Sequence, residues 1–167
     1  MSETAIDRLF LDFSAEKLQE LAPRIEACLG RLTDEQVWAR GQETENAIGN
    51  LVLHLCGNVR QWIISSIGGA PDHRQRDSEF AARGGTSKVQ LLERLSTTVE
   101  EAVAVIRALP AERLAERRVI QGYEVSVLEA IYHVVEHFSM HAGQIIFITK
   151  MLTSADLAFY RHLQTQP

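Results

Sequence analysis

The chain has 167 residues, 46% of them hydrophobic and 23% charged, and its formal net charge is −5. This ordinary globular composition predicts a single domain over residues 1–167, without a nucleic-acid partner or an anionic membrane surface, because both of these require clustered Lys and Arg. No apolar run approaches the ~20 residues that a bilayer span needs, and the N-terminal residues lack the form of a signal peptide, so we expect a cytoplasmic protein.

Apolar residues spaced three and four apart predict four long helices. The first covers about residues 4–30. The second begins near Asn46, a suitable N-cap residue, and continues to Ile67, after which two glycines and Pro71 end it. Each of these helices contains one cysteine, and we expect both cysteines to be buried thiols in a reducing compartment.

The third and fourth helices have clear start signals. The third begins with Thr86 or Ser87 as its cap and continues to about Leu109. The fourth covers about residues 126–152, and its first residue, a serine, forms a capping box with Glu129. A short terminal helix is expected over residues 154–163.

Two connections bear on the topology. Residues 68–86 are long for a joint between helices, where about two to eight residues are typical, so this segment can cross the bundle and leave the second and third helices parallel. Residues 117–127 contain β-branched side chains around Gly122, which predicts a small β-turn or hairpin. We therefore predict an all-α fold, a four-helix bundle with a long crossover between its second and third helices.

Four histidines indicate a metal site. His133, His137 and His141 recur every four residues in the fourth helix, and His54 lies in the second. Imidazoles at i and i+4 stand one turn apart on the same face, so two of them can bind one ion, and a neighbouring helix can supply a third ligand. A lone buried histidine is more often a hydrogen-bonded core residue, so His54 by itself would indicate little.

Wheel position and depth select two of the three histidines in the fourth helix. With Ile131 at zero, apolar residues that include Leu128 and Leu152 fill an arc from about −60° to +60°, and the histidines 141, 137 and 133 fall at about −80°, −120° and −160°. If the second and fourth helices are antiparallel, the depth of His54 in its helix again matches His141 and His137 best. We predict His54, His137 and His141 as the metal ligands.

Three neutral imidazoles would leave open positions on the ion, which is typical of catalytic metal sites. Zn²⁺ or Ni²⁺ suits a set of nitrogen ligands, and the spacing does not separate the two metals. Asn58 lies on the same polar edge of the second helix as His54, and Gln144 lies on the same polar edge of the fourth helix as His141. A polar edge beside an apolar helix face either faces water or lines a cavity, and we take both amides as candidate substrate-binding residues. Glu136 points about 100° away from His137, so no carboxylate ligand is expected.

Three segments together resemble the DinB-like superfamily: H-F-S-M-H-A-G-Q-I-I at 137–146, N-x-x-x-H-L-x-G-N-V-R-Q-W at 50–62, and R-x-x-E-F at 76–80. The resemblance extends from the first helix to about Leu152 and is closest to a branch of unknown function. It implies an up-down-down-up four-helix bundle, commonly a homodimer, with a divalent metal on one histidine of the second helix and two of the fourth. These positions match His54, His137 and His141, and His133 lies outside the triad.

The resemblance also implies a chemistry. Characterised members of the superfamily include thiol-dependent S-transferases and isomerases that use small thiols such as bacillithiol or mycothiol, and their metal activates the thiol. In the R-x-x-E-F segment, Arg76 and Glu79 either form an ion pair that closes the loop, or Arg76 leans over the metal and binds an anionic group of the substrate. Arg76 is therefore a third candidate substrate-binding residue.

Two functions remain open at this point. The first is a metal-dependent enzyme, a thiol S-transferase or a hydrolase, that acts on a small-molecule substrate with a low-molecular-weight thiol as a possible cofactor. The second is a non-catalytic metal- or ligand-binding bundle, perhaps stress-related, and the lack of an evident acid/base residue keeps it open. In both cases we expect a homodimer, with the exposed faces of the first and terminal helices as candidate interfaces.

Overall fold

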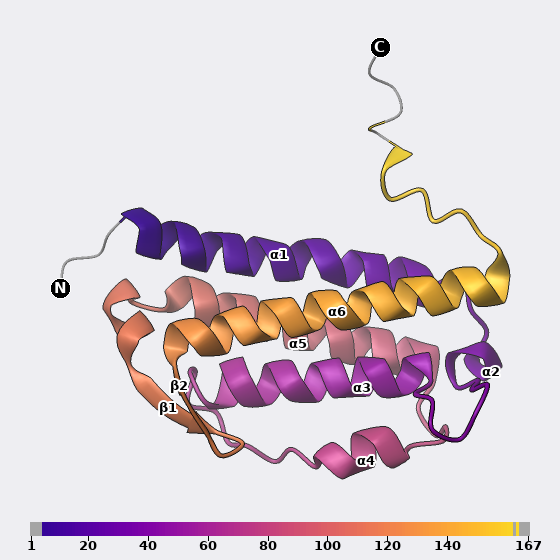
Figure 1. Ribbon diagram of the computed structural model, residues 1–167, viewed down its shortest axis with the longest axis horizontal. Coiled ribbons are helices and arrows are strands. Elements are labelled where there is room, and N and C mark those ends of the chain that lie inside the picture. The colour runs from indigo at the N-terminus through magenta and orange to yellow at the C-terminus, as the bar shows by residue number, and fades with distance from the viewer. Residues whose placement is uncertain (1–4, 162, 164–167) are drawn as a thin grey trace.

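Four long helices form the body of the protein, whose computed structural model describes residues 5–161 and 163. They are α1 (Ala5–Leu29), α3 (Ile48–Val59), α5 (Lys88–Ala108) and α6 (Val127–Thr153). Helices α1 and α6 run in one direction, and α3 and α5 run in the opposite one (Figure 1). Helix α1 packs against α5 and α6, and α3 packs against the same two helices. The predicted all-α, up-down-down-up four-helix bundle is confirmed.

The connection between α3 and α5 returns along the outside of α3 (Figure 1). It contains the short helix α4 (Arg76–Ala81), which packs against α3. The chain thus comes back to the end of the bundle at which α3 began, and α5 starts there. The parallel arrangement of α3 and α5 is what the length of residues 68–86 predicts.

The helix starts agree with the sequence in two cases and differ in one. Ser87 caps α5 by accepting the Gln90 N–H, and Ser126 caps α6 by accepting the Glu129 N–H, in a capping box as predicted. Asn46 does not cap α3. The N-cap is Ala47, whose N–H is accepted by Asn50 Oδ1 at 3.1 Å, so a side chain from inside the helix satisfies this donor.

The second predicted helix changes its winding near its end. After Val59 the chain continues as a π-helix, η1 (Arg60–Ser65). Such wide turns are rare and often occur at functional sites, and the 3.6-residue spacing of the sequence did not indicate one. The short helix α2 (Asp34–Val37), which Thr33 caps, was also not predicted.

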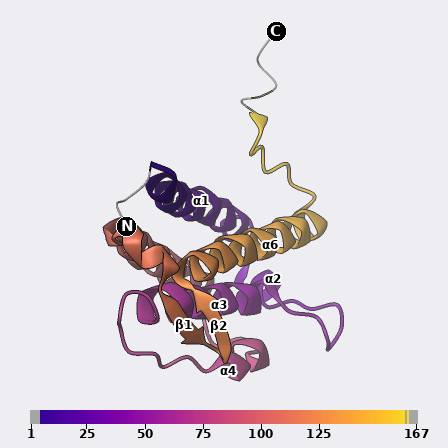
Figure 2. The same ribbon diagram turned by 60° about the vertical axis from the view of Figure 1, so that its left-hand side comes forward.

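A two-stranded hairpin leads into α6, as expected. Strand β1 (Arg117–Ile120) follows the 3₁₀-helix η2 (Ala111–Ala115) and pairs antiparallel with β2 (Tyr123–Ser126). Gln121 and Gly122 have φ angles of 53° and 84°, which is the backbone of a tight type I′ hairpin turn. The hairpin lies beside the crossover segment in both views (Figures 1 and 2).

The predicted terminal helix is wrong over residues 154–160. Ser154 adopts a left-handed conformation, φ 52° and ψ 21°, and ends α6 instead of starting a new helix. Residues 154–158 have no regular structure, and 159–160 form a turn. None of the helices in the described residues combines the length and the apolar character of a membrane span.

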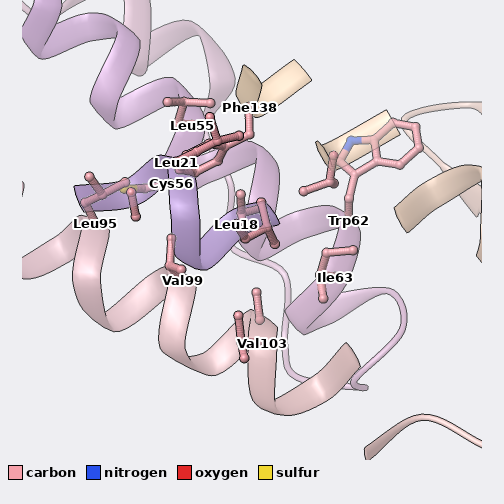
Figure 3. Packing of buried hydrophobic residues seen from close by; sticks show 14 of the residues in the cluster. Leu18, Leu21, Leu55, Cys56, Trp62, Ile63, Leu95, Val99, Val103 and Phe138 are labelled. Atoms are coloured by element: carbon pink, nitrogen blue, oxygen red, sulfur yellow. The ribbon is translucent and has the colours of Figure 1, made fainter. Parts of the chain in front are cut away.

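The core lies between the four helices. Figure 3 shows Phe138 of α6 beside Leu21 of α1 and Leu55 of α3, and all three are buried. Leu128 and Leu152 are 41% and 39% exposed, although the helical wheel placed them in the apolar arc. Leu152 lies in the last turn of α6. Ala130, at about −100° on the same wheel, is buried, whereas Leu128 at about +60° is exposed, because α6 packs against α1 and α3 at once. The buried face of α6 is therefore rotated toward its histidines.

Both cysteines are buried, and Cys56 is enclosed completely enough that burial raises the pKa of its thiol to about 11. We expect the thiols of the native protein to react with a disulfide reagent at least about 100-fold more slowly than after unfolding, because only the thiolate attacks. The absorbance of the released aromatic thiol measures this, with the guanidinium-unfolded chain as control. Rapid modification of two thiols in the native protein would contradict the buried assignment.

Candidate metal centre

Three imidazoles from two helices meet where α3 packs against α6. His54 of α3 is buried, and His137 and His141 of α6 are half-buried. His137 Nε2 lies 3.1 Å from His54 Nε2 and 3.2 Å from His141 Nε2. One ligand atom from each residue lies within 4.8 Å of the others, so the cluster could hold a metal ion. The prediction that these three histidines come together is confirmed.

The two nitrogen–nitrogen distances that involve His137 Nε2 are compatible with one divalent ion. Bonds of about 2.05 Å place ligand nitrogens about 3.3 Å apart in a tetrahedron and about 2.9 Å apart in an octahedron. The observed 3.1 and 3.2 Å lie between these values. Nitrogen donors alone suit Zn²⁺ or Ni²⁺, and the geometry does not choose between them.

The environment keeps the imidazoles of α6 neutral. Burial, together with the neighbouring imidazoles of His141 and His54, lowers the pKa of His137 to about 3. Burial also lowers the pKa of His141, although its hydrogen bond to Gln144 acts in the opposite direction. Neutral imidazole is the form that binds metals.

Two of the three rings are oriented by acceptors on their far side. His54 Nδ1–H donates to Glu79 Oε2 at 3.0 Å, and His141 Nδ1–H donates to Gln144 Oε1 at 2.6 Å. Each bond fixes the tautomer and leaves the Nε2 lone pair facing the centre, as is common for metal-binding histidines. His137 Nδ1 is buried and has no hydrogen-bond partner among the described residues.

Glu79 is an acidic residue of the site, and the sequence did not indicate its partners. Its carboxylate is buried and accepts two hydrogen bonds from Arg74, Nε to Oε1 at 2.8 Å and Nη2 to Oε2 at 3.0 Å. Burial alone would raise the pKa of Glu79, but the hydrogen bonds from His54 and Arg74 outweigh it and lower that pKa below its usual range. The carboxylate therefore stays charged next to His54.

The ion pair that holds the crossover forms between Glu79 and Arg74, so the first of the two alternatives for the R-x-x-E-F segment, a pair between Arg76 and Glu79, is wrong. Arg76 is exposed, and its guanidinium lies 5.0 Å over the ring of Phe80. The Phe80 ring is in turn 4.6 Å from the His54 ring. Arg76 thus lies near the centre without binding Glu79.

A glycine in α3 makes room for this carboxylate. A Cβ atom at Gly57 would lie 1.9 Å from Glu79 Oε1 and 2.9 Å from Arg74 Nε. The glycine stands three residues after His54 in a helix interior, where glycine is unfavourable and often marks a close approach. This was the available sequence signal for the role of Glu79.

Of the remaining candidates, Gln144 contacts one of the three ligands and Asn58 contacts the neighbouring His133. Asn58 Nδ2 is 3.4 Å from His133 Nε2, and Asn58 Oδ1 is buried without a partner among the described residues. Gln144 is exposed and accepts from His141. The substrate-binding roles of Asn58 and Gln144 stay predictions. The ring of His133 lies against Trp62, with centroids 4.2 Å apart, outside the cluster of three as predicted.

Comparison with known proteins gives a family and a fold. A family model described as "Protein of unknown function (DUF1572)" matches residues 5–162. A solved structure, described as the conserved protein of locus from Enterococcus faecalis, is similar with a TM-score of 0.70 and 15% sequence identity, over 86% of this chain and 96% of that chain. At this identity the likeness shows the fold alone. No curated protein matches the chain.

The close approach at Gly57 predicts an asymmetry between two glycines. Gly57→Ala should destabilise the protein by about 1–3 kcal/mol, because its methyl group overlaps the ion pair. Gly143→Ala is the matched control, since nothing lies within 4 Å of a Cβ there, and it should stabilise α6 by about 0.5–1 kcal/mol. Urea unfolding followed by circular dichroism measures both. Equal effects of the two substitutions would mean that Gly57 does not accommodate Glu79.

Proposed function

Because this chain belongs to the DUF1572 family, whose description assigns no activity, we propose a function from the site itself: a divalent metal, Zn²⁺ or Ni²⁺, bound by His54, His137 and His141 serves the transfer of a small thiol onto an electrophile. The convergence of the three Nε2 atoms carries this proposal. We also propose that the chain belongs to the DinB-like superfamily, which its three sequence segments and its bundle topology support.

Open coordination favours catalysis over a structural role. Three protein ligands leave at least one position for a small molecule, whereas structural sites are closed by four ligands. A divalent metal held there supplies Lewis acidity, which lowers the pKa of a thiol or water bound to it. The chain itself holds His54 through Glu79 and His141 through Gln144, and Phe80 covers one side of the His54 ring.

The described residues favour a nucleophile from outside the chain. Both cysteines are buried, and neither belongs to the cluster of three histidines. The carboxylate nearest to the centre, Glu79, is bound by Arg74 and His54, so it is not a free base. A low-molecular-weight thiol as cosubstrate supplies the missing nucleophile and agrees with the chemistry of the superfamily.

The hydrogen bonds that occupy the Glu79 carboxylate also support a second function, a non-catalytic metal- or ligand-binding bundle. In that case the metal would stabilise the fold or be the stored ligand, and no general acid or base would be needed. The two functions share the metal and differ in turnover.

We also propose that the chain forms a homodimer through the outer face of α1. Ile6, Leu9 and Phe13 follow one another at steps of three and four and are 76%, 67% and 59% exposed. An apolar stripe of this kind on a helix surface is typical of an interaction site. Analytical ultracentrifugation decides between the dimer and a monomer.

Metal content tests the site directly. The purified protein should contain about one divalent metal ion per chain, and the double variant His137→Ala/His141→Ala should contain none, because one remaining imidazole binds weakly. His133→Ala is the matched control and should keep the metal. Elemental analysis of the three proteins measures this. Stoichiometric metal in the double variant would refute the site, and loss on His133→Ala alone would refute the choice of ligands.

Turnover tests the reaction. The metal-loaded protein, challenged with a panel of small thiols and electrophiles, should consume thiol and lose this activity on His54→Ala or with a chelator. Cys28→Ala should leave the rate unchanged, because the reacting thiol is not part of the chain. A fully metal-loaded protein that turns over no pair would favour the non-catalytic function.

A further inference from the structure

A cleft of about 490 Å³ lies beside the metal centre, between three segments that are far apart in the sequence. Gln61 of η1, Arg74 and Arg76 of the crossover, and Gln121 and Tyr123 of the hairpin line it. Its volume is in the range of small-molecule sites. None of these five residues is among the three histidines of the metal centre.

The cleft is one side chain away from the metal ligands. Arg74 Nη2, from the cleft wall, lies 3.2 Å from His54 Nδ1. On another wall, Arg76 lies over Phe80, whose ring contacts the His54 ring. Because Arg74 contacts His54 on its Nδ1 side, away from the Nε2 atoms, a molecule bound in the cleft would have to extend past Phe80 to present a second group to the three histidines.

The lining carries uncompensated positive charge. It contains two arginines and no carboxylate, whereas the whole chain has a net charge of −5. Glu79 neutralises Arg74, but the described residues give Arg76 no ion pair. Arg76 is thus a charged donor at the wall of a cleft without an anionic partner.

The other side chains are arranged so that donors remain. Gln61 Oε1 accepts from Gln121 Nε2 at 2.6 Å and from Arg74 Nη1 at 3.0 Å, and these bonds tie the hairpin to the crossover. Gln61 Nε2 donates to Asp72 Oδ2 at 2.7 Å, so the oxygen and one N–H of this amide are used within the protein. The Arg76 guanidinium is the charged donor of the lining that has no hydrogen-bond partner among the described residues, and the Tyr123 hydroxyl has none either. A guanidinium pairs best with a planar or tetrahedral oxyanion.

We propose that this cleft binds an oxyanionic group, a carboxylate or a phosphate, of the molecule that reacts at the metal centre, with Arg76 as its charged partner and Tyr123 as a second donor. The inference rests on the proposed function and narrows its substrate class: one of the two reactants is an anion whose charged group lies apart from its reacting atom. A neutral thiol paired with a neutral electrophile would leave Arg76 without a use.

Isothermal titration calorimetry with succinate, inorganic phosphate and neutral succinamide tests this on the full-length protein as purified. Succinate or phosphate should bind, succinamide should not, and Arg76→Gln should weaken the binding at least about 10-fold, because a charge-assisted pair is lost. Tyr123→Phe should weaken it several-fold. Arg31→Gln, the same charge change at an exposed arginine outside the cleft, should have no effect. Whichever anion binds more tightly identifies the oxyanion.

The variant His137→Ala/His141→Ala separates this inference from the proposed function. Anion binding that persists in this variant and is lost on Arg76→Gln supports the cleft, even if the protein contains no metal. Anion binding that disappears in the histidine variant and is unchanged in Arg76→Gln shows direct ligation to the metal and overturns the inference while the metal site stands. The absence of any binding of succinate or phosphate to the wild type also overturns it.

Discussion

The buried carboxylate of Glu79 is the group on which the site depends. A charge removed from water is costly unless it is paired and hydrogen-bonded, and Glu79 meets this condition with two bonds from Arg74 and one from His54. The same two oxygen atoms therefore fix the crossover against α3 and fix the tautomer of His54. The position of the crossover and the orientation of the His54 ring therefore depend on the same carboxylate.

The bundle topology supplies the partners for this arrangement. The antiparallel packing of α3 and α6 brings His54 opposite His137 and His141, although 83 residues separate the first two. The parallel packing of α3 and α5 requires a long return segment, and that segment carries Arg74 and Glu79 past the open side of α3. The crossover thus not only connects α3 and α5: its residues lie on the outer side of the three-histidine cluster and form one wall of the adjoining cleft.

What the sequence could predict follows from how local each feature is. The imidazoles at 137 and 141 share a face because helix geometry alone sets a four-residue step, and the length of residues 68–86 alone limits the topology. The partner of Glu79 depends on how that whole segment folds, so Arg76 and Arg74 could not be separated by spacing. The exposed Leu128 and the left-handed Ser154 were likewise missed, because two neighbouring helices set the burial of α6 and a single backbone angle ends it.

The separation of the three histidines along the chain has a consequence for the order in which the protein matures. Contacts between residues so distant form late, since the intervening chain has to be ordered first. Two of the three imidazoles belong to the last helix of the bundle, so a partly synthesised chain that ends before α6 contains only one of the three residues, His54. An ion held by all three histidines could therefore be bound only after the bundle is complete, and a loaded centre would mark a chain that has finished folding.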